Sequence, residues 1–283
     1  MKQTFVLLIG MWILALLAAA PAQAILCPAN TVPFNNQCLS TLLNPPCPPD
    51  SVKVGATCVD KYEASVWQIP ANNQALINKV IQGKATLANL TSGGAVQRGV
   101  GGVDDYPCDN TGNACADIYA VSIPGVKPSA DISWFQAQQA CGNSGKRLLR
   151  NGEWQQAAAG TPDPGTDNGT TDCNITNDGF PANDPVTTGS RSQCISRWGT
   201  FDMVGNVWEW VEDWVPLSTA CVQALFGLTG DLNCLAGAST MAGPGALIRG
   251  GLFALGADAG VFAVSGSFEP SNALVFVGFR CGR

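Results

Sequence analysis

Cysteine is the residue type in this sequence that most clearly could take part in chemistry. The chain has 12 Cys and no His, and every Cys follows residue 24. An even number of cysteines in an exported chain is typical of a disulfide framework. Zinc is the competing interpretation, but the sequence contains no CxxC-type pair. The lack of His excludes Ser-His-Asp triads, Cys-His dyads and His-ligated metal centres.

The N-terminus predicts export. Lys2 is followed by an apolar stretch over residues 5–20 and by the A-x-A sequence of residues 22–24, which together are typical of a cleaved signal peptide. We expect a signal peptide over residues 1–24, a mature chain beginning at Ile25, and a secreted, periplasmic or cell-surface location. An uncleaved anchor is the alternative. No later segment is apolar over about 20 residues, so we expect no transmembrane segment after cleavage.

The composition narrows the classes of partner. Only 13% of the 283 residues are charged, the net charge is −6, and there are 32 Gly and 18 Pro. These values indicate a loop-rich globular protein. No run or stripe of Lys and Arg is present, so we do not expect a nucleic-acid partner.

Cysteine spacing predicts small covalently closed loops. A Cys-Pro pair begins two similar units, one from Cys27 to Cys38 and one from Cys47 to Cys58. We expect two disulfide-closed hairpins, and a Cys-rich segment over residues 25–57 ahead of a main domain over 58–283. Proximity in the sequence predicts five bridges: Cys27–Cys38, Cys47–Cys58, Cys108–Cys115, Cys173–Cys194 and Cys221–Cys234.

The elements that must position any site are short. We expect a strand over 58–66, a surface excursion over 68–129 with a short helix near 75–81, a long loop over 160–200, a half-buried strand over 208–214 and short strands at the C-terminus. Two further helices are expected, over 134–141 with Ser133 as N-cap and over 151–159. The fold class is therefore α+β with much irregular structure.

Four segments resemble one family. Residues 145–154 read GKRLLRNGEW, residues 202–210 read DMVGNVWEW, residues 249–251 read RGG and residues 278–281 read GFRC. In this order they resemble the formylglycine-generating enzyme, or sulfatase-modifying factor, family over roughly residues 58–283. The resemblance implies a C-type-lectin-like fold of that type.

The same resemblance implies a long-range disulfide and a calcium site. It pairs Cys141 with Cys281. It also implies a structural calcium ion bound along the DMVGNVWEW turn, and a second candidate site. The ligands would be Asp202, Gly205, Val207 and Glu209, and at the second site Asn174 and Ile175. Oxygen ligands at irregular spacing suit Ca²⁺. The alternative is that Asp202 caps a turn and Glu209 pairs with an Arg.

The family's redox chemistry lacks its ligands here. Enzymes that make formylglycine resemble one another in a Cys pair shortly after RGG, which holds copper(I). Residues 249–262 contain no Cys, and related iron-dependent members use His ligands. We therefore expect no redox cofactor, no catalytic residue and a non-catalytic function. The alternative is a formylglycine-generating-type oxidase or another protein-modifying factor.

The C-terminal region resembles a diversified recognition surface. GAxAGVFA at 256–263, PSN at 270–272 and VGFR at 277–280 resemble the variable region of proteins targeted by diversity-generating retroelements. We expect residues 249–283 to bind an unidentified protein or surface ligand. The candidate binding positions are Leu252, Phe253, Ala254, Leu255, Asp258, Ser265, Gly266, Ser267, Phe268, Ala273, Leu274, Val275 and Phe276. Val264 belongs to the same variable set, and Gly256, Ala257, Gly260, Phe262 and Pro270 would hold the backbone. Buried strands at 252–255 and 273–276 are the alternative.

Overall fold

The computed structural model describes residues 31–34, 37–40, 46–163, 167–176, 184–216, 230–234 and 243–283. The chain divides into two units, Met1–Pro45 and Pro46–Arg283. The expected signal peptide, Cys27 and Cys221 lie outside the described residues. In the part that the structure describes, no helix is both long and apolar enough to cross a membrane.

The first unit contains the first expected hairpin. Strands β1 (Thr31–Phe34) and β2 (Gln37–Ser40) are antiparallel, with Thr31 opposite Ser40 and Phe34 opposite Gln37. The Cys27–Cys38 bridge cannot be placed, because Cys27 is outside the described residues.

The second hairpin belongs to the large unit. Cys47 and Cys58 are disulfide-bonded across it. Its second strand pairs with the C-terminal strand, and Cys58 and Arg283 exchange two backbone hydrogen bonds of 2.8 and 2.9 Å. The large unit begins at Pro46, whereas the expected boundary was 58. The hairpin belongs to it because its second strand is the partner of the C-terminal strand β14 (Cys281–Gly282). The sheet order is β3 (Ser51–Val54), β4 (Thr57–Asp60), β14 (Cys281–Gly282) and β8 (Arg147–Leu148).

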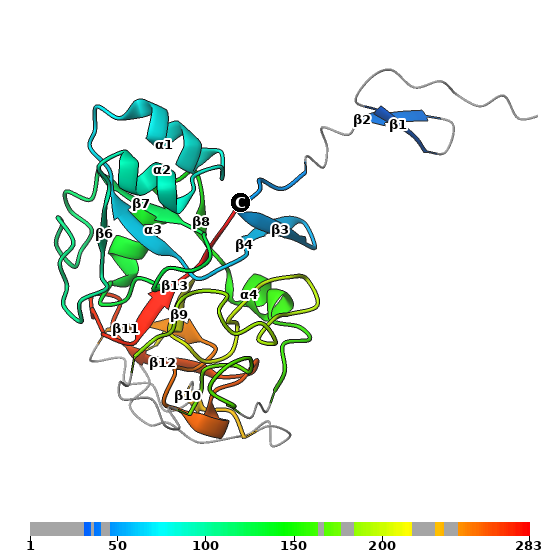
Figure 1. Cartoon of the computed structure of the whole chain (residues 1–283). Coiled ribbons are helices and arrows are strands. Elements are labelled where there is room, and N and C mark those ends of the chain that lie inside the picture. The colour runs from blue at the N-terminus through cyan, green and yellow to red at the C-terminus, as the bar shows by residue number, and fades with distance from the viewer. Residues whose placement is uncertain are drawn as a thin grey trace, which may run out of the picture. The chain divides into compact units, whose positions relative to one another are not determined.

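A five-stranded sheet carries the C-terminal region (Figure 1). The DMVGNVWEW segment enters its strand β9, between β11 and β13. The β13–β9 pair is parallel, with Val277 opposite Trp208, and the β11–β9 pair is antiparallel. In sheet order the strands are β10 (Asn233–Cys234), β12 (Val264–Phe268), β11 (Pro244–Arg249), β9 (Trp208–Pro216) and β13 (Val277–Phe279).

The expected surface excursion has a core of its own, so that prediction was wrong. Strand β7 within it is buried along its whole length. Helix α1 (Gln74–Ile81) packs its apolar face on the sheet that contains β7. Leu90 of α2 (Leu87–Ser92) belongs to the same hydrophobic cluster. The expected single strand over 58–66 is also broken, because the chain leaves β4 at Asp60 and enters the sheet of β5, β6 and β7 at Ser65. Its elements are β5 (Ser65–Gln68), α1 (Gln74–Ile81), α2 (Leu87–Ser92), β6 (Val96–Arg98) and β7 (Ile118–Val121).

Two helices flank the GKRLLRNGEW segment. Helix α3 (Trp134–Asn143) begins at the expected cap, where Ser133 accepts a hydrogen bond from Gln136 N and the Gln136 side chain accepts one from Ser133 N. Helix α4 (Asn151–Ala157) has Arg150 at its N-cap, and an Arg side chain cannot accept a hydrogen bond from the first turn. The Asp213 carboxylate instead accepts from Asn151 N at 2.6 Å.

Disulfides join these elements. Cys108–Cys115, Cys173–Cys194 and Cys141–Cys281 are formed as expected. Cys234 is also disulfide-bonded, and the expected partner Cys221 lies outside the described residues. The Cys141–Cys281 bridge links α3 to β14 inside the main hydrophobic cluster, which is formed by both helix and sheet residues. The α+β class is confirmed.

Candidate functional site

A buried ion pair holds the DMVGNVWEW strand against the C-terminus. Both Glu209 carboxylate oxygens lie 2.7–3.0 Å from the Arg280 guanidinium. Trp154 Nε1 donates a further hydrogen bond of 2.7 Å to Glu209 Oε2. Glu209 belongs to the strand that was expected to be half buried, where it was expected to bind calcium or to pair with an Arg. It is 1% exposed, because Arg280 compensates its charge in the interior.

Two more carboxylates lie near this pair. Burial raises the pKa of Asp202 to about 7, and burial with Asp202 and Glu209 nearby raises that of Glu63 well above its ordinary value. Glu63 accepts hydrogen bonds from Asn206 Nδ2 and Val207 N. Hydrogen bonds from this turn to Glu63 and the ion pair between Glu209 and Arg280 thus hold the turn in place.

The proposed calcium ligands are largely engaged with the protein. Asp202 Oδ2 accepts from Gly189 N at 2.7 Å, as a turn-capping carboxylate would. Glu209 is paired with Arg280, so both observations match the alternative that the sequence left open. Among the described residues, no group of three or more His, Cys, Asp and Glu side chains could hold a metal ion. Calcium binding at this turn stays a prediction. The donor set as it lies here does not fit the ion, because Asp202 and Glu209 are already bonded to protein groups.

The other expected ligands are Gly205 and Val207 in this turn and Asn174 and Ile175 in the segment packed against it. The amide of Gly205 donates to Gly250 O at 3.1 Å, and that of Val207 to Glu63. The carbonyls of Asn174 and Ile175 accept from Asn206 N and Gly256 N at 2.8 and 2.7 Å. These bonds tie the turn to the RGG segment and to the start of the candidate binding region.

Close backbone contacts fix the C-terminal region after RGG. Gly251 has a φ of +88°, and a Cβ there would lie 2.4 Å from Ala259 Cβ. A Cβ at Gly260 would lie 2.2 Å from the Asp231 carboxylate. Pro270 is buried, and its carbonyl accepts from Trp134 N. These positions cannot change without moving the backbone.

The expected scaffold residues are only partly confirmed by burial. Gly256 has a φ of +59° and lies in the short 3₁₀ helix η2 (Gly256–Asp258). Ala257 is exposed, and Phe262 has 41% of its surface exposed. Burial therefore does not identify these two side chains as anchors of the region. It does identify Ala259 and Ala263, which are both fully buried.

Ten of the thirteen candidate binding positions reach the surface. Ala254 and Val275 are exposed, and Val275 has 52% of its surface in solvent. The apolar members pack against the main core with one side and leave the other accessible. The rings of Phe268 and Phe276 meet edge to face at 6.1 Å. The partly buried positions are Leu252, Leu255, Asp258, Ser267, Phe268, Ala273, Leu274 and Phe276.

The other three positions are buried, which corrects the expectation for them. Ser265 is 2% exposed and shares a hydrogen bond with Ser267. A Cβ at Gly266 would lie 2.5 Å from Val215 Cγ2. Phe253 is 6% exposed, and its amide donates to Asn206 O. Val264, also placed in the variable set, is 4% exposed. The first two lie in strand β12, where the neighbouring strands cover them.

A pocket of about 150 Å³ opens beside the candidate binding positions Phe253 and Val275. Its other walls come from the loop that begins at Gly99, from residues 127–131 and from residues 184–185. Asp131 is the buried charged residue in this lining, at 5% exposed. Sequence reasoning missed it. The available signal was an Asp two residues before a helix N-cap, between Ala130 and Ile132.

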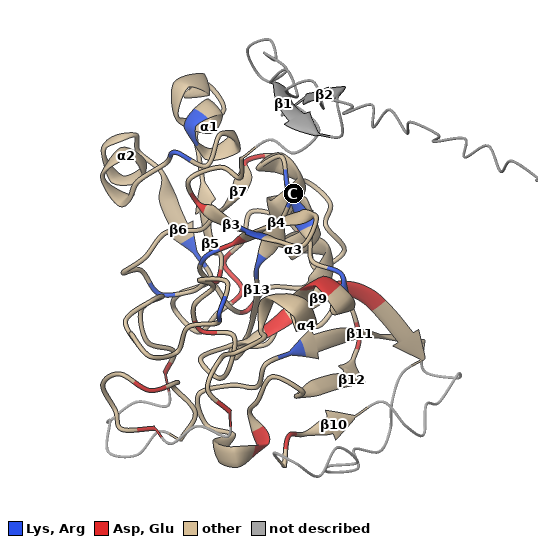
Figure 2. Ribbon diagram, turned by 90° about the vertical axis from the view of Figure 1, so that its right-hand side faces the viewer, with Lys and Arg blue, Asp and Glu red and all other residues tan. Residues whose placement is uncertain are grey.

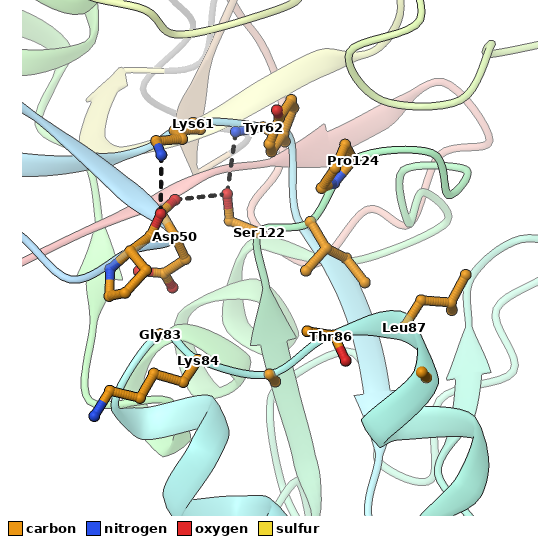
Figure 3. A pocket seen from close by; sticks show the side chains of 13 residues that line it. Asp50, Lys61, Tyr62, Gly83, Lys84, Thr86, Leu87, Ser122 and Pro124 are labelled. Atoms are coloured by element: carbon orange, nitrogen blue, oxygen red, sulfur yellow. Dashed lines mark hydrogen bonds between the residues drawn. The ribbon is translucent and has the colours of Figure 1, made fainter.

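A larger pocket of about 540 Å³ lies elsewhere in the large unit (Figure 3). It is bounded by the segment between α1 and α2, by residues after β7 and by Asp50, Lys61 and Tyr62. The lining polar groups are largely used within the protein: Lys61 donates to Pro49 O, and Ser122 joins Tyr62 N to Asp50 O. No candidate binding position lines it.

Charges in the described residues show no concentrated basic surface. Lys and Arg are dispersed over the large unit and several are next to acidic residues (Figure 2). Lys146, for example, is buried between Asp50 and Asp60 at 2.7 and 2.8 Å.

Comparison with known proteins identifies related sequences. The family model for the sulfatase-modifying factor enzyme 1-like domain matches residues 103–283. The chain is 32% identical over 101 residues to the formylglycine-generating enzyme of Thermomonospora curvata, covering 31% of this chain and 33% of that protein. It is 28% identical over 142 residues to the hercynine oxygenase of Mycolicibacterium smegmatis, covering 44% and 33%. The matches thus span about a third of the length of these relatives.

Similar solved structures include variable proteins. The P3c variant of the Major Tropism Determinant has a TM-score of 0.44 and 16% identity, covering 90% of this chain and 60% of that chain. The M1 variant has a TM-score of 0.43 and 18% identity, covering 83% and 52%. Treponema denticola variable protein 1 has a TM-score of 0.39 and 16% identity, covering 82% and 97%.

Proposed function

We propose that this chain, which belongs to the sulfatase-modifying factor enzyme 1-like family, is an exported, non-catalytic ligand-binding protein with a diversified C-terminal surface. Its large unit has the C-type-lectin-like fold of the formylglycine-generating-enzyme type that the four motifs predict. Family membership alone does not decide between binding and catalysis, because one fold can carry either.

One observation carries the proposal: the C-terminal region separates fixed from replaceable positions. Gly251, Ala259, Gly260 and Ala263 leave no space for a larger side chain or are fully buried. Among and after them along the chain, ten candidate binding positions have accessible side chains. A surface of this kind can change its side chains while its backbone stays in place, which is what a diversified recognition surface requires.

The accessible positions are rich in apolar residues. Leu252, Leu255, Leu274, Phe268 and Phe276 are only partly buried, although each packs against the main core. Apolar side chains gathered at a protein surface are typical of interaction sites, and aromatic residues dominate the energy of many interfaces. We infer that a protein or surface ligand contacts this region.

The non-catalytic part of the proposal rests on missing ligands. Residues 249–262, where the parent enzymes have their Cys pair, contain no Cys, and the chain has no His. We expect purified, copper-loaded protein to leave a sulfatase-motif peptide unoxidised, as measured by mass spectrometry. Turnover of the peptide would favour the oxidase alternative.

The diversification part is tested by sequencing. We expect a nearby copy of the 3′ end of the gene with adenines at the variable codons, and an adjacent reverse-transcriptase gene. Sequencing the region from many cells should show substitutions at the ten accessible positions and none at Gly251 or Gly260. Substitutions spread evenly over the region, or confined to third codon bases, would contradict the proposal.

A pair of display libraries tests the structural argument independently. The first library randomises the ten accessible positions with codons derived from Asn, and the matched library randomises ten buried positions of the same unit, including Ala259 and Ala263. We expect most clones of the first library, but few of the second, to display folded protein. Equal loss of folding in both would show that the accessible positions are part of the core.

A further inference from the structure

The pocket beside Phe253 and Val275 has an uncompensated negative charge. Asp131 is 5% exposed, and no described residue donates a hydrogen bond to its carboxylate or forms an ion pair with it. Buried carboxylates normally have such partners, since an isolated buried charge is unfavourable. An unpartnered carboxylate in a pocket therefore indicates a partner that comes from outside the chain.

The backbone of Asp131 is fixed next to the candidate binding positions. Its amide donates to Leu274 O at 3.0 Å, and the preceding amide, of Ala130, donates to Gly99 O at 2.8 Å. Asp131 has a φ of +52°, a conformation that non-Gly residues adopt rarely and that the surrounding structure must maintain. The backbone that carries the carboxylate is thus held in place before any ligand arrives.

The charges around the pocket do not neutralise Asp131. Lys127 is the cation in the lining, and it pairs with Asp184 at 2.5 Å, with both side chains about half exposed. Burial, together with the nearby Asp104 and Asp105, raises the pKa of Asp131. The local field therefore favours a positive ligand group and disfavours an anion.

We propose that this pocket binds a primary ammonium or guanidinium group on an aliphatic stem, with Asp131 as the residue that recognises its charge. The proposal rests on the proposed function, because Phe253 and Val275 belong to the candidate binding positions, and it names the ligand chemistry of that site. In a protein ligand the group would be a Lys or Arg side chain.

The size and the walls of the pocket suit such a group. A volume of about 150 Å³ equals that of about five water molecules in the liquid, enough for the end of a long cationic side chain. The nearly buried Phe253 offers an apolar wall for the stem. Val275, with 52% of its surface exposed, can contact the part of the ligand that remains outside. Replacing Val275 would change the side chain at the edge of the pocket and would leave Asp131 in place.

The test uses small probes of matched size. n-Butylammonium and n-butylguanidinium are titrated into the whole protein at low salt, with 1-butanol as the neutral isostere, and binding is followed by protein NMR shifts. We expect the cations to bind with a dissociation constant of about a millimolar, and 1-butanol at least tenfold more weakly. Equal binding of 1-butanol and n-butylammonium would overturn the proposal.

Two variants separate recognition from structure. Asp131→Asn should weaken n-butylammonium at least tenfold while leaving the Tm unchanged or higher, since Asn tolerates a positive φ and removes the unpaired charge. Asp184→Asn, the matched variant at the pocket rim, should change the affinity less than threefold. A marked fall in the Tm of Asp131→Asn would show a structural carboxylate and overturn the proposal, as would unchanged binding.

The outcome is independent of the diversification test. If n-butylammonium does not bind but sequence variation clusters at the ten accessible positions, the charge recognition fails and the proposed function stands. If the cation binds through Asp131 but the gene region is invariant, the pocket is a fixed binding site and the diversified surface fails.

Discussion

Removing the Cys141–Cys281 disulfide should destabilise the large unit more than removing any other described bridge. The two residues are 140 positions apart, and both are fully buried. In the chain-entropy model, closing a loop of this length lowers the unfolded-state entropy by an amount worth about 5 kcal/mol at 25 °C. That is comparable with the whole stability of many domains.

The matched control is the Cys108–Cys115 bridge. It spans 7 positions, for which the same model gives about 2.4 kcal/mol. Replacing either pair with Ala also removes two sulfur atoms. Both are buried in the Cys141–Cys281 pair, but Cys108 of the control is only partly buried, so lost burial adds up to about 1 kcal/mol to the difference. The loop lengths account for about 2.6 kcal/mol of the expected difference between the variants.

The assay is urea unfolding of both double-Ala variants and of the parent under non-reducing conditions, followed by tryptophan fluorescence. Equal slopes of the transitions would confirm that the same structure unfolds in each. If the two variants lose stability within 1 kcal/mol of each other, on the order of the error expected for such measurements, or in the reverse order, loop closure is not the main contribution of this bridge.

Three further predictions follow from buried charges. Glu209→Gln should cost about 3–5 kcal/mol of unfolding free energy, because Arg280 stays charged and buried, whereas Glu153→Gln in a partly exposed pair should cost about 1 kcal/mol or less; equal costs in urea would refute this. Burial raises the pKa of Asp60 from 3.8 to about 6, so the folded state retains a proton that the unfolded state loses, and stability should fall as pH rises between these values. Asp60→Asn should make that fall shallower, and an unchanged slope of unfolding free energy against pH would contradict it. Finally, if Glu209 stays paired with Arg280, adding Ca²⁺ to chelator-treated protein should leave the Tm unchanged by calorimetry, and a rise of several degrees would show bound calcium instead.

Local signals in the sequence predicted local structure well. Ser133 three residues before Gln136 specified the start of α3, since both side chains complete a reciprocal cap. Close cysteine spacing predicted three of the described disulfides. Only the family resemblance supplied Cys141–Cys281, because no local pattern connects residues so distant.

Tertiary context decided the features that the sequence did not predict. The run from Ile118 to Val121 is short and apolar, a pattern that does not distinguish a buried strand from a loop covering the core. Glu209 has the alternating pattern of an exposed acid, but Arg280 accompanies it into the interior.

The candidate site was predicted in outline only. Regular alternation does not apply to an irregular backbone, so it could not identify Phe253 and Ser265 as buried among accessible neighbours. Asp131 was missed because it stands out only by having no hydrogen-bond donor or cation beside its carboxylate among the described residues. A sequence pattern contains no information about such missing partners.

The position of β14 between β4 and β8 determines when this unit can become folded. During synthesis, β4 is made early, but its neighbour appears only when residues 281–282 emerge. Arg280 and Cys281, which are equally late, supply the partners of Glu209 and Cys141. Until then, the β3–β4 hairpin lacks the strand that joins it to β8, so this sheet is completed late, although the sheet of β5, β6 and β7 can pack with α1 and α2 earlier.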